Sequence, residues 1–143
     1  VHSLISALSR YTGIKIVLIS PEELELPDYI QRDVIDKNGL ESYKTTDLLE
    51  VMPKLDVLYM TRVQKERVFN EDDYLRLRDS YILTPDKLET AKKELKILHP
   101  LPRVNEISVK IDEDPRACYF KQVRNGKFIR MALILKLLKE AEA

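Results

Sequence analysis

The feature that most constrains this chain is the alternation of helical and extended patterns along its whole length. Apolar residues at helical spacing precede each of the extended runs IKIVLIS (14–20), DVLYMT (56–61) and KIL (96–98). Such alternation is typical of β/α crossovers, which place parallel strands in a sheet that helices cover on both faces. We therefore predict an α/β fold with a doubly wound, Rossmann-like, mostly parallel sheet of four to five strands and helices on both faces.

Proline and glycine bound the expected helices, because proline favours a first helical turn and glycine favours the position after the last turn. The predicted helices are one over 4–11 closed by Gly13, one from Pro27 to Asn38-Gly39, one from Pro85 through Leu95, and one from about Pro115 that is interrupted or bent near Asn125-Gly126. A weak strand near ESYKT (41–45) leads to a short helix from about Asp47. Thr46 is its expected N-cap.

Composition narrows the class of protein. A chain of 143 residues suits a single domain with one core. The 24 Lys and Arg residues balance the 24 Asp and Glu residues, which gives no global reason to expect a nucleic-acid or membrane partner. One cysteine, Cys118, and two distant histidines offer neither an internal disulfide nor a zinc-site spacing. A reducing, cytosolic setting fits, and the missing initiator methionine suggests a fragment.

Two distinctive segments follow predicted strands. TRVQKER (61–67) begins where DVLYM ends, and HPLPRV (99–104) begins where KIL ends. Ligands of open α/β sheets bind beyond the carboxyl ends of the strands, so both segments would share one edge if the two strands are neighbours. The planar guanidinium of Arg62 suits a carboxylate, Gln64 adds an amide, and Lys65 and Arg67 make the rim positive.

The HPLP segment offers acceptors. Pro100 and Pro102 fix their own φ and lack N–H groups, so the carbonyls near Leu101 and Pro102 could accept from an amine or amide. An acidic small molecule that carries an amino group would satisfy both segments. Arg62 as ordinary solvated surface and His99 as a structural histidine remain open alternatives. The three glycines exclude a G-x-G-x-x-G motif and a P-loop.

Four segments together resemble a known family. VHSL (1–4), LYMTRVQKER (58–67), HPLPRVNEIS (99–108) and YFKQVRNGKFIRMAL (119–133) are similar, in this order, to the C-terminal, aspartate-binding half of aspartate carbamoyltransferase. The resemblance runs along the whole chain. Ornithine carbamoyltransferases typically carry a cysteine where this chain has Pro100, so the aspartate branch is favoured.

The resemblance implies roles for individual residues. Arg62 would hold a carboxylate of L-aspartate with help from Gln64, and the backbone carbonyls of Leu101 and Pro102 would contact the carbamoyl group and the attacking amine. Residues 64–80 would form a flap that closes over the substrates. Its expected latch residues are Lys65, Glu66, Arg67 and Tyr74.

The resemblance also implies an activity. The family transfers a carbamoyl group from carbamoyl phosphate to L-aspartate in de novo pyrimidine biosynthesis, without metal or organic cofactor. The full-length parent of this chain is expected to be a cytoplasmic homotrimer. The carbamoyl-phosphate domain, with its Ser-Thr-Arg-Thr segment, is absent from this chain. Residues 1–143 would thus be one aspartate-binding domain, inactive alone. The alternatives are a non-catalytic metabolite-sensing or partner-docking module of the same fold, and a carbamoyltransferase for another amino acid.

Overall fold

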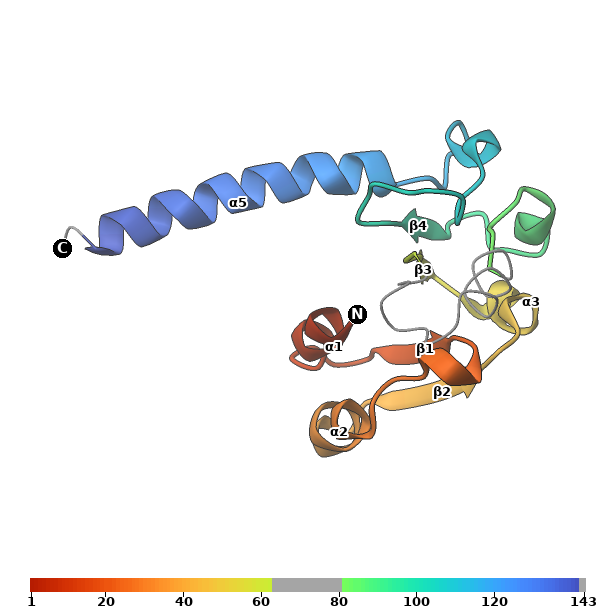
Figure 1. The fold of residues 1–143 in the computed structure, drawn as a ribbon, viewed down its shortest axis with the longest axis horizontal. Coiled ribbons are helices and arrows are strands. Elements are labelled where there is room, and N and C mark those ends of the chain that lie inside the picture. The colour runs from red at the N-terminus through yellow and green to blue at the C-terminus, as the bar shows by residue number, and fades with distance from the viewer. Residues whose placement is uncertain (63–80, 142–143) are drawn as a thin grey trace.

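The computed structural model describes residues 1–62 and 81–141 (Figure 1). Its helices and strands alternate along the chain, as the sequence pattern predicts. The helices are α1 (His2–Leu8), α2 (Asp28–Ile30), α3 (Leu48–Val51) and α5 (Tyr119–Ala141), and the strands are β1 (Lys15–Ile19), β2 (Glu41–Thr45), β3 (Val57–Tyr59) and β4 (Lys96–Leu98). A wider π-helical stretch over Gln31–Ile35 and a tighter 3-10 turn over Asp36–Asn38 continue α2, so that the helical segment runs on as far as Asn38.

The strands form two parallel pairs. β1 pairs with β2 from Lys15 opposite Glu41 onward, and β3 pairs with β4 from Val57 opposite Lys96 onward. Figure 1 shows β3 between β4 and β1, and side chains of β1 pack against the core beneath β3. The predicted parallel strands are therefore confirmed. Among the described residues, hydrogen bonds join them into two two-stranded sheets and not into one sheet of four to five strands.

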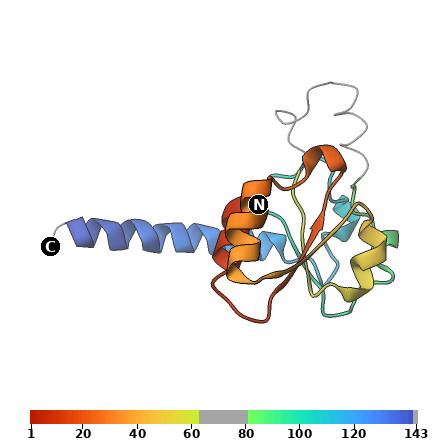
Figure 2. The ribbon, with the colours of Figure 1, turned by 90° about the horizontal axis from the view of Figure 1, so that it is seen from below.

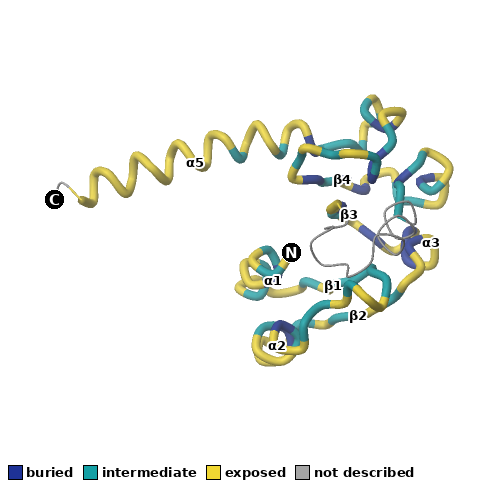
Figure 3. The backbone as a smooth tube through the Cα atoms, in the orientation of Figure 1, coloured by how far each residue is buried: buried dark blue, intermediate teal, exposed yellow. Residues whose placement is uncertain are grey.

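Two groups of buried side chains hold the domain together. The larger group surrounds β3 and β4, and the smaller one lies where α1 and α2 cover β1. The larger group comprises Leu48, Val51, Met52, Leu55, Leu58, Met60, Leu83, Leu88, Leu95, Ile97, Ile107, Ile111 and Tyr119, and the smaller one comprises Ile5, Ile30 and Ile35. Figure 3 shows that the buried backbone concentrates around β3 and β4. The strand pair that leads to the predicted site is thus the best-packed part of the described chain.

The cap of α3 differs from the prediction. Asp47, and not Thr46, is the N-cap, because its carboxylate Oδ1 accepts from the backbone N–H of Leu49 at 2.8 Å and of Glu50 at 3.3 Å. A carboxylate in this position also interacts favourably with the positive end of the helix. The helix consequently begins at Leu48.

The predicted helix from Pro85 through Leu95 is wrong. Only Asp86–Leu88 forms a single 3-10 turn, and the following residues make further tight turns such as Ala91 N–H to Leu88 O at 3.2 Å. These turns still bury Leu88 and Leu95 almost completely. The apolar spacing thus reflects burial, which successive tight turns provide as well as a helix does.

The last helix begins later than predicted and has no interruption. The chain from Arg116 to Cys118 runs beside β4, since Ile97 N–H donates to Arg116 O and Cys118 N–H donates to Ile97 O, both at 2.9 Å. An extended segment cannot also be the first turn of a helix, so α5 begins at Tyr119 instead of Pro115. It then continues unbroken through Asn125-Gly126.

Helix α5 leaves the rest of the domain after its first turn. Figures 1 and 2 both show it projecting away from the strands, and Figure 3 shows its backbone exposed along almost its whole length. Its apolar side chains are between 50% and 69% exposed at Phe128, Ile129, Leu133, Ile134, Leu137 and Leu138. Within the described ranges, no helix is long and apolar enough to cross a membrane.

Candidate functional site

The carboxyl ends of β3 and β4 lie side by side. Leu58 pairs with Ile97 and Tyr59 with Leu98 in parallel register, and the N–H of Met60 donates to Leu98 O at 2.8 Å. The segments that begin at Thr61 and His99 therefore start from one edge, which confirms the predicted neighbourhood of the two strands.

The predicted binding residues fall into two groups. Arg62 lies at this edge, is exposed, and makes no ion pair with residues 1–62 or 81–141. No carboxylate among these described residues therefore competes with a ligand for the Arg62 guanidinium. Gln64, Lys65, Glu66, Arg67 and Tyr74 lie outside the described residues, so their predicted roles stay predictions.

The HPLP turn has an unusual backbone. Leu101 adopts a left-handed conformation with φ of 48°, and the Leu101–Pro102 peptide bond is cis. A left-handed conformation costs a non-glycine residue about 1 to 2 kcal/mol, so neighbouring groups must stabilise it. Within the part of the chain that the structure describes, no donor reaches the carbonyl of Leu101 or Pro102. Both carbonyls are thus left as acceptors.

A buried pair of side chains lies directly behind this turn. His99 Nε2 is 2.8 Å from Glu106 Oε1, and the two residues are only 1% and 5% exposed. His99 Nδ1 accepts from the N–H of Leu101 at 2.8 Å. The imidazole therefore connects the left-handed residue of the turn to a buried carboxylate.

Glu106 is held in its charged form. Burial alone would raise the pKa of its carboxyl, but the backbone N–H groups of Glu106 and Val104, the His99 imidazole and the Asn105 N–H together lower that pKa below its ordinary value. The hydrogen bonds to Glu106 Oε2 from Val104 and Asn105 measure 3.0 and 3.1 Å. The carboxylate is thus an acceptor on both oxygens.

Gln122, in the first turn of α5, connects the two strand ends. Its Oε1 accepts from the N–H of His99 at 2.8 Å, and its Nε2 donates to the hydroxyl of Tyr59 at 3.4 Å. Sequence reasoning missed Gln122, Glu106 and Tyr59. Glu106 and Gln122 do lie within the segments that carry the family resemblance, but no spacing rule places them beside His99.

The Arg103 side chain is engaged within the domain. Its guanidinium forms a two-pronged ion pair with Asp112, whose carboxylate also accepts from the Tyr119 hydroxyl at 2.5 Å. The hydrogen bonds from Arg103 and Tyr119 lower the pKa of Asp112 to about 2, and burial, aided by Asp112, raises the pKa of Tyr119 to about 12. This cluster ties the turn to the start of α5, and it engages the Arg103 guanidinium in an ion pair.

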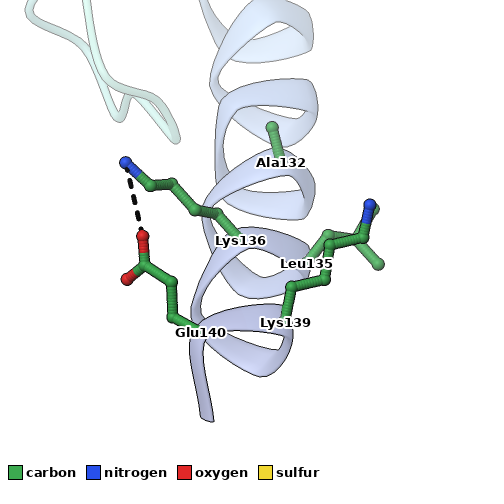
Figure 4. A pocket seen from close by; sticks show the side chains of 5 residues that line it. All are labelled: Ala132, Leu135, Lys136, Lys139 and Glu140. Atoms are coloured by element: carbon green, nitrogen blue, oxygen red, sulfur yellow. Dashed lines mark ion pairs between the residues drawn. The ribbon is translucent and has the colours of Figure 1, made fainter. Parts of the chain in front are cut away.

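A surface depression lies elsewhere and carries no comparable chemistry. Figure 4 shows it on α5, lined by Ala132, Leu135, Lys136, Lys139 and Glu140, with Lys136 Nζ 3.7 Å from Glu140 Oε1. All five side chains come from one exposed helix, which cannot enclose a ligand by itself. Over residues 1–62 and 81–141, no three His, Cys, Asp or Glu side chains are grouped to hold a metal ion.

Comparison with known proteins identifies the family of this chain. Residues 1–137 match the profile of the aspartate/ornithine carbamoyltransferase family, Asp/Orn binding domain. The chain belongs to this family. Within it, the sequence is 62% identical over 138 residues to the aspartate carbamoyltransferase catalytic subunit of Clostridium acetobutylicum and 59% identical to that of Lachnoclostridium phytofermentans. Each alignment covers 96% of this chain and 45% of the relative, so the chain spans about half the length of these carbamoyltransferases.

Solved structures of the carbamoyltransferase family have the same fold. The catalytic subunit of M. jannaschii aspartate transcarbamoylase superposes with a TM-score of 0.87 at 37% identity, over 97% of this chain and 46% of that one. Aspartate transcarbamoylase from Trypanosoma cruzi, in complex with carbamoyl phosphate and aspartate, gives 0.82 at 37% identity, over 93% and 44%.

Proposed function

We propose that residues 1–143 are the aspartate-binding domain of an aspartate carbamoyltransferase, which transfers a carbamoyl group from carbamoyl phosphate to L-aspartate in pyrimidine biosynthesis. The observation that carries this proposal is the shared edge of β3 and β4, from which the segment with the exposed Arg62 and the turn at Leu101 and Pro102 both start. The identity of 62% to an aspartate carbamoyltransferase catalytic subunit supports the choice of aspartate over ornithine.

The proposed chemistry uses few groups from this domain. Arg62 grips a carboxylate of aspartate through two parallel N–H donors, and Gln64 adds a hydrogen bond. The amino nitrogen forms a bond to the carbamoyl carbon, and the bond from that carbon to the phosphate oxygen breaks. The phosphate leaves with the electron pair and takes up the proton that the amine loses. The carbonyls of Leu101 and Pro102 accept from the N–H groups of the reacting amine and carbamoyl group, which orients both reactants.

Further features complete the proposal for the whole protein. Residues 64–80 form a flap in which Lys65, Glu66, Arg67 and Tyr74 act as latch residues. The full-length protein is a cytoplasmic homotrimer that needs no metal or organic cofactor.

The four strands belong to one doubly wound arrangement in the order β2, β1, β3, β4. The packing of Val17 and Ile19 of β1 against the core beneath β3 supports this order. This chain alone is expected to be inactive, since the family resemblance implies that the groups which hold the phosphate belong to a carbamoyl-phosphate domain that these 143 residues do not contain.

A direct assay tests the proposed activity. The full-length protein that contains this chain is incubated with carbamoyl phosphate and either L-aspartate or L-ornithine, and the carbamoylated amino acid is measured. We expect turnover with aspartate and none above background with ornithine. Turnover with ornithine alone would assign the other branch of the family, and no turnover with either would support the non-catalytic binding module.

A further inference from the structure

We infer that His99 is a positioning residue whose neutral imidazole, kept in the Nε2–H tautomer by Glu106, fixes the Leu101 amide and so aims the Leu101 and Pro102 carbonyls at the reactants. The inference concerns a residue that the proposed mechanism does not use. It rests on the proposed function for what those carbonyls contact, whereas the tautomer itself rests only on the hydrogen bonds within this chain.

The partners of His99 determine where its proton lies. The Leu101 N–H can only donate, so Nδ1, at 2.8 Å from it, must be an unprotonated acceptor. The Glu106 carboxylate can only accept, so Nε2, at 2.8 Å from its Oε1, must carry the proton. Both requirements agree on one neutral tautomer. A doubly protonated ring would leave two N–H groups facing one another at Nδ1 and Leu101.

Glu106 is in turn fixed by the same turn that His99 supports. Its Oε2 accepts from the backbone N–H groups of Val104 and Asn105, while its Oε1 accepts from His99. The first and last residues of the loop from 99 to 106 are therefore joined by the hydrogen bond between the His99 and Glu106 side chains. Gln122 anchors the start of the loop by accepting from the N–H of His99 at 2.8 Å.

This arrangement explains why Leu101 keeps its left-handed conformation. The N–H of Leu101 has its acceptor in the His99 imidazole, so the ring helps to hold a left-handed conformation that costs a non-glycine residue free energy. His99 is 1% exposed and both of its ring nitrogens are occupied, so it has no free nitrogen with which to take a proton from a substrate. Its role is consequently to hold the turn, and it does not act as a general base.

The tautomer can be measured directly on the 143-residue chain by nitrogen NMR of its imidazoles. The chain contains only two histidines, His2 and His99, so a His2→Gln sample assigns the signals. We expect Nδ1 of His99 to have the shift of an unprotonated nitrogen and Nε2 that of an N–H nitrogen. A protonated Nδ1, or rapid averaging of the two nitrogens, would overturn the inference without bearing on the proposed activity.

Kinetics of the full-length protein test the positioning role. Glu106→Gln keeps the size of the side chain but places an amide NH2 against either His99 or the two backbone N–H groups. We expect it to lower kcat by about tenfold to a hundredfold, the range for a misplaced reacting geometry, with a smaller change in KM for aspartate. Wild-type turnover with an unchanged kcat in Glu106→Gln would refute the positioning role, whereas an inactive wild type would instead refute the proposed function.

A matched pair of His99 variants separates positioning from packing. In His99→Asn the amide oxygen can replace Nδ1 and accept from Leu101, whereas in His99→Gln the longer amide reaches Glu106 but leaves the Leu101 N–H unpaired. We expect His99→Asn to keep the higher kcat even if its melting temperature is the lower of the two. Equal kcat values, or a higher kcat for His99→Gln, would contradict the inference. If neither variant folds, the NMR result on the unmodified chain still decides.

Discussion

Arg103 and Asp112 form a two-pronged ion pair, with Nη2 of the arginine 2.6 Å from Oδ2 of the aspartate, that joins the HPLPR turn to the loop before α5. The Tyr119 hydroxyl donates to the same carboxylate, and the Arg103 guanidinium lies 5.6 Å from the centre of the Tyr119 ring. Tyr119 is the first residue of α5 and fully buried. The conformation of the turn and the origin of the helix are therefore coupled through one carboxylate.

The first prediction concerns how the contribution of Asp112 to the free energy of unfolding depends on pH. The pKa of Asp112 is about 2 in the folded chain, below the ordinary value of about 3.9, because Arg103 and Tyr119 donate to the charged form. A lowered folded-state pKa contributes stability that is present above pH ~4 and is lost as the pH falls toward ~2. We expect Asp112→Asn to lower the free energy of unfolding by about 1.5 to 3 kcal/mol at pH 6 and by less at pH 3.

Urea unfolding of the 143-residue chain at both pH values measures this difference. The exposed neighbour Glu113 supplies the control, since Glu113→Gln removes a carboxylate one residue away that makes no described contact. Other carboxylates with lowered pKa values, such as Asp114, contribute equally to wild type and variant. A gap between wild type and Asp112→Asn that stays constant from pH 6 to pH 3 would show that Asp112 is not the titrating group.

The second prediction separates a binding role of Arg62 from ordinary surface. In the full-length protein, Arg62→Ala should reduce kcat/KM for aspartate more than roughly a hundredfold, because the loss of two charged hydrogen bonds costs at least about 3 kcal/mol. Arg62→Lys should recover only part of this, since an ammonium restores the charge without the planar fork. Steady-state kinetics and melting temperatures are measured together. A near-normal kcat/KM, or a loss explained by unfolding, would place Arg62 on ordinary surface.

The third prediction contrasts two leucines. Leu95 is fully buried against the β3–β4 core, whereas Leu133 on α5 is 54% exposed. Leu95→Ala should lower the free energy of unfolding of this chain by about 2 to 5 kcal/mol, because it removes packed methyl groups and leaves a cavity. Leu133→Ala should change it by no more than about 0.5 kcal/mol. Equal losses in denaturant unfolding would mean that α5 packs against something in solution.

The fourth prediction concerns the helix that projects from the domain. Beyond Gln122, α5 has exposed or half-exposed side chains only, and an isolated helix of this kind is held mainly by its own hydrogen bonds. In hydrogen-exchange experiments on the 143-residue chain at low concentration, amides from 128 to 141 should exchange much faster than those of Ile97 and Leu98. Protection equal to that of β4 would indicate a covered helix. Repeating the measurement at higher concentration separates self-association from stability of the helix itself.

Several features of the fold follow from local sequence alone. Alternating patterns located β1 to β4, and Asn38-Gly39 marked the end of the segment after Pro27, where Gly39 has φ of 64°. A left-handed glycine and a run of β-branched residues impose their geometry within a few residues, so no distant contact is needed to recognise them. The shared edge beyond β3 and β4 also followed, because parallel strands align their carboxyl ends.

Tertiary contacts decided the remainder. Helix α5 begins at Tyr119 because residues 116–118 pair with β4, and Leu101 is left-handed because His99, braced by Glu106, accepts its N–H. The start of α5 and the conformation of Leu101 both depend on groups that only folding brings together. Local propensities differ by only about 1 kcal/mol per residue, which is less than the cost of leaving one buried hydrogen-bonding group without a partner. The sequence by itself therefore determined the strands and the edge that they share, whereas only the tertiary structure determined how the HPLP turn at that edge is held.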